Sequence, residues 1–147
     1  MNTKTLKGMG AAASLLIGIG AASPALALLT PPQILGAAPN SIDVWTFSCP
    51  AGTGSAIARV YDSTAVFNAA ALMQVVLGED GLPTDQETDF GEGGAPSAFA
   101  VVPDGPGLYA MAFKKTAGGA DSYVGEAFCV TGAGAVPPVG LTKRINQ

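Results

Sequence analysis

Asp85, Glu87 and Asp89 stand at alternating positions in the most acidic stretch of the chain, and carboxylates at this spacing suit calcium chemistry. Ca²⁺ takes about six to eight oxygen ligands from carboxylates, backbone carbonyls and water. An EF-hand loop is excluded, because Phe90 stands where that loop needs glycine and Pro96 where it needs glutamate. The three acids are therefore calcium candidates, and a solvated acidic loop is the alternative interpretation.

The chain contains no histidine, which removes the general base of Ser-His-Asp and Cys-His catalysis. The turn at residues 52–55 is not a nucleophile elbow, because it precedes a predicted strand rather than a helix. A serine–lysine dyad would need Lys114 or Lys115, and a solvated pair at the end of a strand explains both lysines better. Paired carboxylates can hydrolyse glycosides, but here they crowd one stretch of chain. We therefore expect no catalytic residue and no enzyme, with calcium as the sole candidate cofactor.

Cys49 and Cys129 are the two cysteines of the chain. In an oxidising compartment an isolated pair forms a disulfide. The spacing excludes a Cys-x-x-Cys redox motif, and the lack of histidine argues against a zinc site. We predict a structural disulfide that closes a loop of about 80 residues and contributes roughly 4 kcal/mol to stability on the chain-entropy model.

Residues 1–27 have the three parts of a secretory signal peptide: a basic tip with Lys4 and Lys7, an apolar stretch, and a small-residue exit that ends at Ala27. An uncleaved membrane anchor is the alternative, since about 20 apolar residues span a bilayer. Pro24 interrupts the apolar stretch and favours cleavage. We predict removal of residues 1–27 and a secreted location, periplasmic or extracellular.

Net charge narrows the classes of partner. The seven basic residues fall to five once Lys4 and Lys7 leave with the signal, against eleven acidic residues, so the remaining chain carries a net charge of −6. Nucleic acids and anionic lipids are bound by basic patches, so we expect neither nucleic acid nor membrane as a partner after cleavage. Few charged residues and many small ones are typical of an extracellular β-protein.

Alternating apolar residues between Gly- and Pro-rich turns predict strands. We expect six of them, at residues 42–49, 55–62, 70–77, 97–102, 108–114 and 122–131. Trp45 and Phe47 share one face of the first, and Tyr109 and Phe113 share one face of the fifth, which makes these four aromatic side chains the predicted core. The expected fold class is all-β, an antiparallel β-sandwich of jelly-roll-like character with one disulfide.

Four segments make up the predicted organisation: a signal peptide at residues 1–27, an extended Pro-rich leader at 28–40, the sandwich domain at 41–131 and a Gly/Pro-rich tail at 132–147. Residues 63–77 fit either a helix capped near their start or a loop followed by a strand, and we favour the strand. Residues 78–96 are expected to form a long acidic loop, with Phe90 tucked against the sandwich.

Three short patterns resemble the bacterial pre-peptidase C-terminal domains. They are an opening Asp43-x-Trp45-x-Phe47, a Gly107-Leu108-Tyr109 strand and a closing Ser122-Tyr123-x-Gly125 strand. The resemblance covers residues 41–131. It implies a secreted β-sandwich of the kind appended to proteases and other hydrolases, where it serves export, substrate binding or adhesion.

The expected function is that of an exported, non-enzymatic binding or adhesion module at the cell surface or in the extracellular matrix, with a protein or polysaccharide partner. One alternative is a structural subunit that self-associates, adding its leader to the sheet edge of a neighbour. Another is a carbohydrate- or calcium-binding accessory of a secreted hydrolase. Trp45, Tyr61, Tyr109 and Tyr123 could form a sugar-stacking platform, although aromatic residues at alternating strand positions are more often core.

Overall fold

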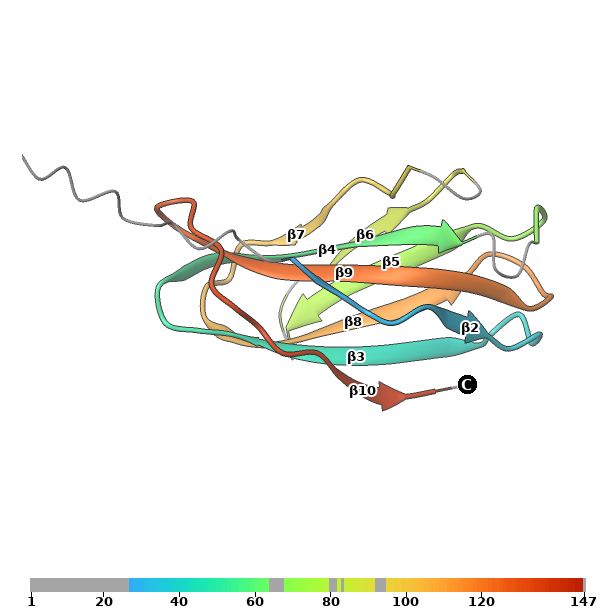
Figure 1. Cartoon of the computed structure of the whole chain (residues 1–147), viewed down its shortest axis with the longest axis horizontal. Helices are drawn as coiled ribbons and strands as arrows, with labels where there is room; N and C mark the ends of the chain where they lie inside the picture. Colours follow the sequence, from blue (N-terminus) through green and yellow to red (C-terminus); the bar gives the residue numbers. More distant parts are fainter. Residues whose placement is uncertain (1–26, 64–67, 80–81, 83, 92–94, 147) are drawn as a thin grey trace, which may run out of the picture.

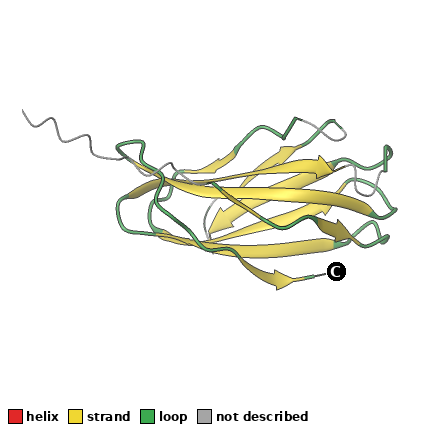
Figure 2. Ribbon diagram, viewed as in Figure 1, coloured by secondary structure: helices red, strands yellow, loops and turns green. Residues whose placement is uncertain are grey.

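The computed structural model describes residues 27–63, 68–79, 82, 84–91 and 95–146, and those residues form strands, turns and loops without a helix (Figure 2). Their ten strands make two antiparallel five-stranded sheets that enclose one apolar core (Figure 1). The predicted fold class, an all-β sandwich with one disulfide, is confirmed.

Sheet A has β9 (Asp121–Thr131) and β4 (Thr53–Ser63) at its centre. One edge is β7 (Ala100–Val102), and the other is formed by β1 (Leu28–Leu29) and β2 (Gln33–Leu35), which both pair with β9. The leader predicted as an extended segment is therefore the edge of its own sheet. Buried Leu35 holds it there, together with two hydrogen bonds: the N–H of Thr30 donates to the carbonyl of Gly125, and the N–H of Gly125 donates to the hydroxyl of Thr30.

Sheet B has the strand order β10, β3, β8, β5, β6. These strands are β10 (Thr142–Ile145), β3 (Ile42–Cys49), β8 (Gly107–Lys115), β5 (Met73–Glu79) and β6 (Asp85–Thr88). Apart from the β5–β6 hairpin, the chain changes sheet between consecutive strands from β3 to β10. Parts of the sequence far apart therefore meet on each face.

The core follows the two-residue period of the strands. In β3 and β8 the four predicted core residues, Trp45, Phe47, Tyr109 and Phe113, are all buried. The ring of Phe113 stacks on that of Tyr123 at a centroid distance of 4.5 Å. Gly125 on β9 makes room for it, because a Cβ atom at Gly125 would collide with the Phe113 ring.

The predicted disulfide between Cys49 and Cys129 is present and joins the end of β3 in sheet B to β9 in sheet A. The two Cα atoms lie 5.6 Å apart, within the ordinary range for a disulfide. Both cysteines are buried, so the bond is a link between the two layers inside the core. It is compatible with a protein that folds in an oxidising compartment.

Two segments differ from the sequence-based expectation. Residues 78–96, predicted as one acidic loop, contain β6, which forms a hairpin with β5. The segment 132–147, predicted as a tail, contains β10, which pairs with β3. The uncertain stretch at 63–77 contains the start of β5, so the strand interpretation is confirmed for residues 73–77, while residues 64–67 lie outside those described.

Candidate functional site

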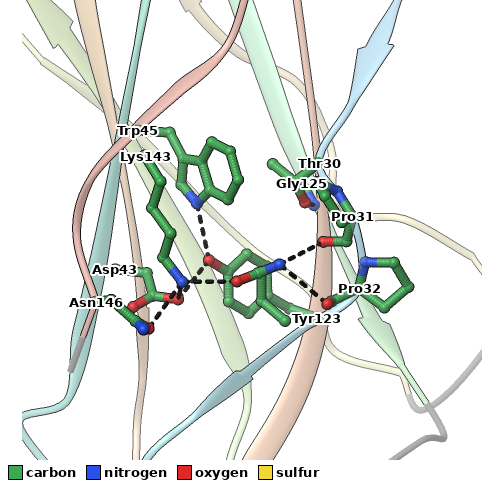
Figure 3. Close-up of polar contacts among 10 residues, drawn as sticks. Thr30, Pro31, Pro32, Asp43, Trp45, Tyr123, Gly125, Lys143 and Asn146 are labelled. Atoms are coloured by element: carbon green, nitrogen blue, oxygen red, sulfur yellow. Dashed lines mark hydrogen bonds and ion pairs between the residues drawn. The ribbon is translucent and has the colours of Figure 1, made fainter.

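A buried hydrogen-bond chain links the two sheets along one side of the sandwich. Nε1 of Trp45 donates to the hydroxyl of Tyr123 at 3.1 Å, and that hydroxyl donates to Oδ2 of Asp43 at 2.8 Å (Figure 3). All three side chains are buried. Burial, and then the nearby carboxylate of Asp43, raise the pKa of Tyr123, so its hydroxyl stays a donor at physiological pH.

Lys143 of β10 closes this chain from the C-terminal end. Its Nζ forms an ion pair with Oδ2 of Asp43 at 2.8 Å and donates to Oε1 of Gln33 at 2.6 Å and to Oδ1 of Asn146 at 2.8 Å (Figure 3). The Gln33 amide in turn donates to the carbonyls of Pro31 and Pro32. The polar seam, our name for Asp43, Trp45, Tyr123, Lys143 and Gln33, therefore joins the leader, β3, β9 and β10.

The groups of the polar seam are directed at one another, which makes the seam a structural network. A buried carboxylate is costly unless a cation and donors surround it, and Asp43 has both. Three of the residues that carry the family resemblance, Asp43, Trp45 and Tyr123, lie in it. Their chemistry in this fold is to hold two sheets and both ends of the chain together.

Lys115, a candidate for a serine–lysine dyad, is held in a different structural role. Its ammonium group is buried and donates to the carbonyls of Gly36, Ala38 and Gly119. Burial lowers the pKa of Lys115, and the charge of Asp121 partly opposes that shift. Lys115 fastens the end of the leader to the β8–β9 turn.

The three calcium candidates lie on or next to the edge strand β6. Asp85 is on the inward side of β6, because it pairs with the buried Leu77, and Glu87 pairs in the same way with Val75. Oδ2 of Asp85 accepts a hydrogen bond from the backbone N–H of Val101 on β7 at 2.8 Å. Inward-pointing acids at an edge strand prevent pairing with another chain, which gives Asp85 and Glu87 a structural role.

Asp89 follows β6 and is buried. Its carboxylate accepts hydrogen bonds from the backbone N–H groups of Asp62 at 2.7 Å and Gly91 at 3.0 Å. Among the described residues, no three or more acidic, histidine or cysteine side chains come together as a group that could hold a metal ion. Asp85, Glu87 and Asp89 therefore do not meet as one set of metal ligands. Phe90, expected to tuck against the sandwich, is instead 81% exposed.

The outer face of sheet A carries the bulky apolar side chains that the core does not use. Along β4 the small residues Ala56 and Ala58 point inward and are buried. Ile57, Arg59 and Tyr61 alternate with them and point outward. Strand register then sets their neighbours: Ile57 lies between Val101 and Phe128, and Tyr61 beside Val124.

The leader extends this face. Leu29 pairs with Glu126 and Ile34 with Ser122, so both leader side chains lie on the outward side of β9 and are more than half exposed. We call the whole surface the apolar face. It consists of Leu29, Ile34, Ile57, Arg59, Tyr61, Phe99, Val101, Val124, Glu126 and Phe128.

Arg59 and Glu126 are the charged residues of the apolar face, and they neutralise each other in an ion pair. The guanidinium carbon of Arg59 lies 4.5 Å from the ring centroid of Phe99 and 5.0 Å from that of Tyr61. The Tyr61 hydroxyl donates to Glu126 at 2.7 Å, and burial together with this carboxylate raises the pKa of Tyr61. The ring of Phe99 meets that of Phe128 edge-on. These contacts hold the side chains in fixed positions.

A hollow of about 210 Å³ indents the apolar face between Phe99, Glu126 and Phe128, with Ala27 and Val136 at its rim. The outer face of sheet B has a shallow groove of about 430 Å³ over the small residues Thr46, Gly78 and Ala110. Arg144 donates to the Thr46 hydroxyl at that groove. Val76, Leu82 and Leu108 also line this groove, so the outer face of sheet B carries aliphatic side chains too, whereas the aromatic side chains of Tyr61, Phe99 and Phe128 lie on the apolar face.

The proposed sugar-stacking residues do not form one surface. Trp45, Tyr109 and Tyr123 are buried in the core or the polar seam, and Tyr61 lies on the apolar face. The two-residue period of a strand is enough to place Ile57, Arg59 and Tyr61 on one face. It does not show that Leu29, Ile34, Phe99 and Phe128 join them, because that depends on which strands become neighbours.

No family model, no curated protein and no solved structure matches this chain. The resemblance to pre-peptidase C-terminal domains therefore stays a prediction. The described part of the chain has no helix with the length and hydropathy of a membrane span.

Proposed function

We propose that this protein is an exported, non-enzymatic binding module that acts at the cell surface or in the extracellular matrix and binds through the apolar face. The observation that carries the proposal is that the exposed side chains of Leu29, Ile34, Phe99 and Val101 all lie on the outer face of sheet A. Contiguous exposed apolar patches with a polar rim mark interaction sites on soluble proteins.

The composition of the apolar face supports a macromolecular partner. Tyr, Phe and Arg are enriched in protein interfaces, and residues of these types anchor binding when they are held rigidly. Arg59 contacts the rings of both Tyr61 and Phe99, and Glu126 accepts hydrogen bonds from Arg59 and Tyr61. A preorganised surface loses less conformational entropy when it binds.

A non-enzymatic role is supported by the chemistry of the chain. It has no histidine, and the ionisable groups Asp43, Lys115 and Lys143 are each engaged in contacts that hold strands together. Calcium is not part of the proposal, since Asp85 and Asp89 accept hydrogen bonds from backbone N–H groups.

The proposal is tested by retention of the labelled mature protein on the producing cells and their matrix. Val101→Ser on the apolar face should lower retention at least about tenfold, because it places a hydroxyl without a hydrogen-bond partner in an apolar contact. The matched control is Leu108→Ser, an exposed apolar residue on the outer face of sheet B. Equal retention of both variants and the unaltered protein, or no retention of any, would contradict the proposal.

A further inference from the structure

The charge and size of the apolar face favour one kind of partner. We infer that the apolar face binds a second copy of this chain, so that two sandwiches pack through their A sheets. This inference rests on the proposed function, because it assigns the occupant of the same face. It differs from polymerisation through the leader, since β1 and β2 stay in the chain's own sheet.

The charge distribution favours a second copy. The chain without its signal carries a net charge of −6, so two copies repel each other wherever their acidic surfaces meet. The apolar face escapes this repulsion, because its two charges, Arg59 and Glu126, form an ion pair with each other. A face that holds both signs is also self-complementary under a two-fold axis, the commonest symmetry of soluble oligomers.

The projected area of the apolar face is comparable with that of a small specific interface. The face spans four strand positions, from the leader across β9 and β4 to β7, and its two central strands have 11 residues each. The edge positions are shorter, residues 28–35 in the leader and three residues in β7, so with strands ~4.8 Å apart and ~3.4 Å per residue the projected area is about 540 Å². Two such faces together bury about 1,100 Å², close to the roughly 1,000 Å² that a specific interface needs.

The shape of the face suits the packing of sheet on sheet. Two sheets pack face to face when apolar side chains from alternating positions interdigitate. Val101, Ile57 and Phe128 form one such row across three neighbouring strands. The hollow beside Phe99 and Phe128 provides a recess for an apolar side chain of the second copy; Ala27, which also lines it, leaves with the predicted signal peptide, whereas Glu126 and Val136 remain.

Sedimentation equilibrium of the mature protein over a range of concentrations tests the inference. The expected mass approaches that of two chains at high concentration. Ile34→Glu at one edge of the face should raise the dimer dissociation constant at least about tenfold, because it places a carboxylate in an apolar interface. Leu108→Glu is the matched control: Leu108 and Ile34 are both 56% exposed, but Leu108 lies on sheet B. Val101→Glu on β7 repeats the test at the opposite edge.

Salt gives a second readout. Because the interface is apolar and the two copies are both acidic, raising the ionic strength should tighten the dimer by screening their repulsion. A monomer at all concentrations, a dimer that Leu108→Glu weakens as much as Ile34→Glu does, or a dimer that salt weakens would overturn the inference. If the protein is monomeric and Val101→Ser still lowers retention on cells, the dimer inference fails and the proposed function stands. If the protein dimerises through this face but is not retained on cells, the proposed function fails.

Discussion

The hydroxyl of Tyr123 lies 2.8 Å from Oδ2 of Asp43, although the two residues are 80 positions apart in the chain. This hydrogen bond crosses from β9 in sheet A to β3 in sheet B, as does the disulfide between Cys49 and Cys129. One link is polar and the other covalent. Each can be removed separately, so their contributions to stability can be measured.

Removing the disulfide should destabilise the domain without changing its fold. The double variant Cys49→Ala/Cys129→Ala frees a loop that the bond closes across 80 positions, which costs up to roughly 4 kcal/mol on the chain-entropy model. Urea unfolding of the variant beside the oxidised and reduced parent measures this loss. Two thiols open to alkylation in the native secreted protein would contradict the assignment.

Phe113→Ala should cost about 3–5 kcal/mol, because the buried ring stacks on Tyr123 and fills the space above Gly125. The control is Phe90→Ala, which removes an 81% exposed ring and should change stability by less than about 0.5 kcal/mol. Thermal or urea unfolding compares the two. Equal losses from both variants would show that the core is misassigned.

Lys143→Met should lower stability by about 1–3 kcal/mol, since it removes the cation beside the buried carboxylate of Asp43. The loss is below that of a fully buried pair because 21% of the Lys143 side chain is exposed. Arg144→Met, on the same strand but exposed, should be nearly neutral. An Arg144 variant as unstable as the Lys143 variant would mean that β10 pairing, rather than the ion pair, is responsible.

Alkaline pH should destabilise the protein through Tyr109. Burial, and then the charge of Glu79, raise the pKa of Tyr109 from 10.0 to about 12. Above pH 10 the unfolded chain loses the Tyr109 proton while the folded chain keeps it. The contribution of this hydroxyl to the free energy of unfolding is therefore fully present below pH 10 and is lost as the pH rises toward 12.

Tyr109→Phe isolates this effect. Between about pH 9 and about pH 11 the unfolding free energy of the parent should fall by about 1 kcal/mol more than that of the variant. Tyr61 and Tyr123, whose pKa values are also raised, remain in both proteins and cancel in the comparison. An identical pH dependence of parent and variant would exclude the effect.

Export predicts a defined N-terminus. N-terminal sequencing of the protein from the medium or periplasm should begin at Leu28, the residue after the predicted cleavage point. Ala27→Arg should block processing, since the exit position of a signal peptide requires a small side chain. A cell-associated product that retains residues 1–27 would support the membrane-anchor alternative.

The long strands could be predicted from the sequence because each has one buried and one outward side. The predicted strand at residues 42–49 coincides with β3, and that at 108–114 lies within β8. Alternation does not show which side is buried, however. In β4 the larger residues Arg59 and Tyr61 face out while Ala56 and Ala58 face in, whereas in β3 and β8 the large aromatic residues Phe47 and Phe113 face in.

The short edge strands could not be predicted in the same way. β2 follows two prolines, β6 is acidic, and β10 lies in a Gly/Pro-rich segment, so none has the local preference of a strand. Pairing with a long neighbour stabilises each of them. The roles of Asp85 and Asp89 also depend on which strands become neighbours. The sequence indicated calcium ligands, whereas the structure shows carboxylates that accept hydrogen bonds from the backbone N–H groups of Val101 and Asp62.

The contact between Lys143 and Gln33 sets the order in which the domain can be completed. A chain that is threaded through a membrane from its N-terminus delivers residues 142–145 long after residues 33–35. The leader can lie along β9 only once β9 has arrived, and the polar seam is finished only when β10 follows. In the export predicted from residues 1–27, the domain would therefore be completed only after β10 has followed β9 across the membrane.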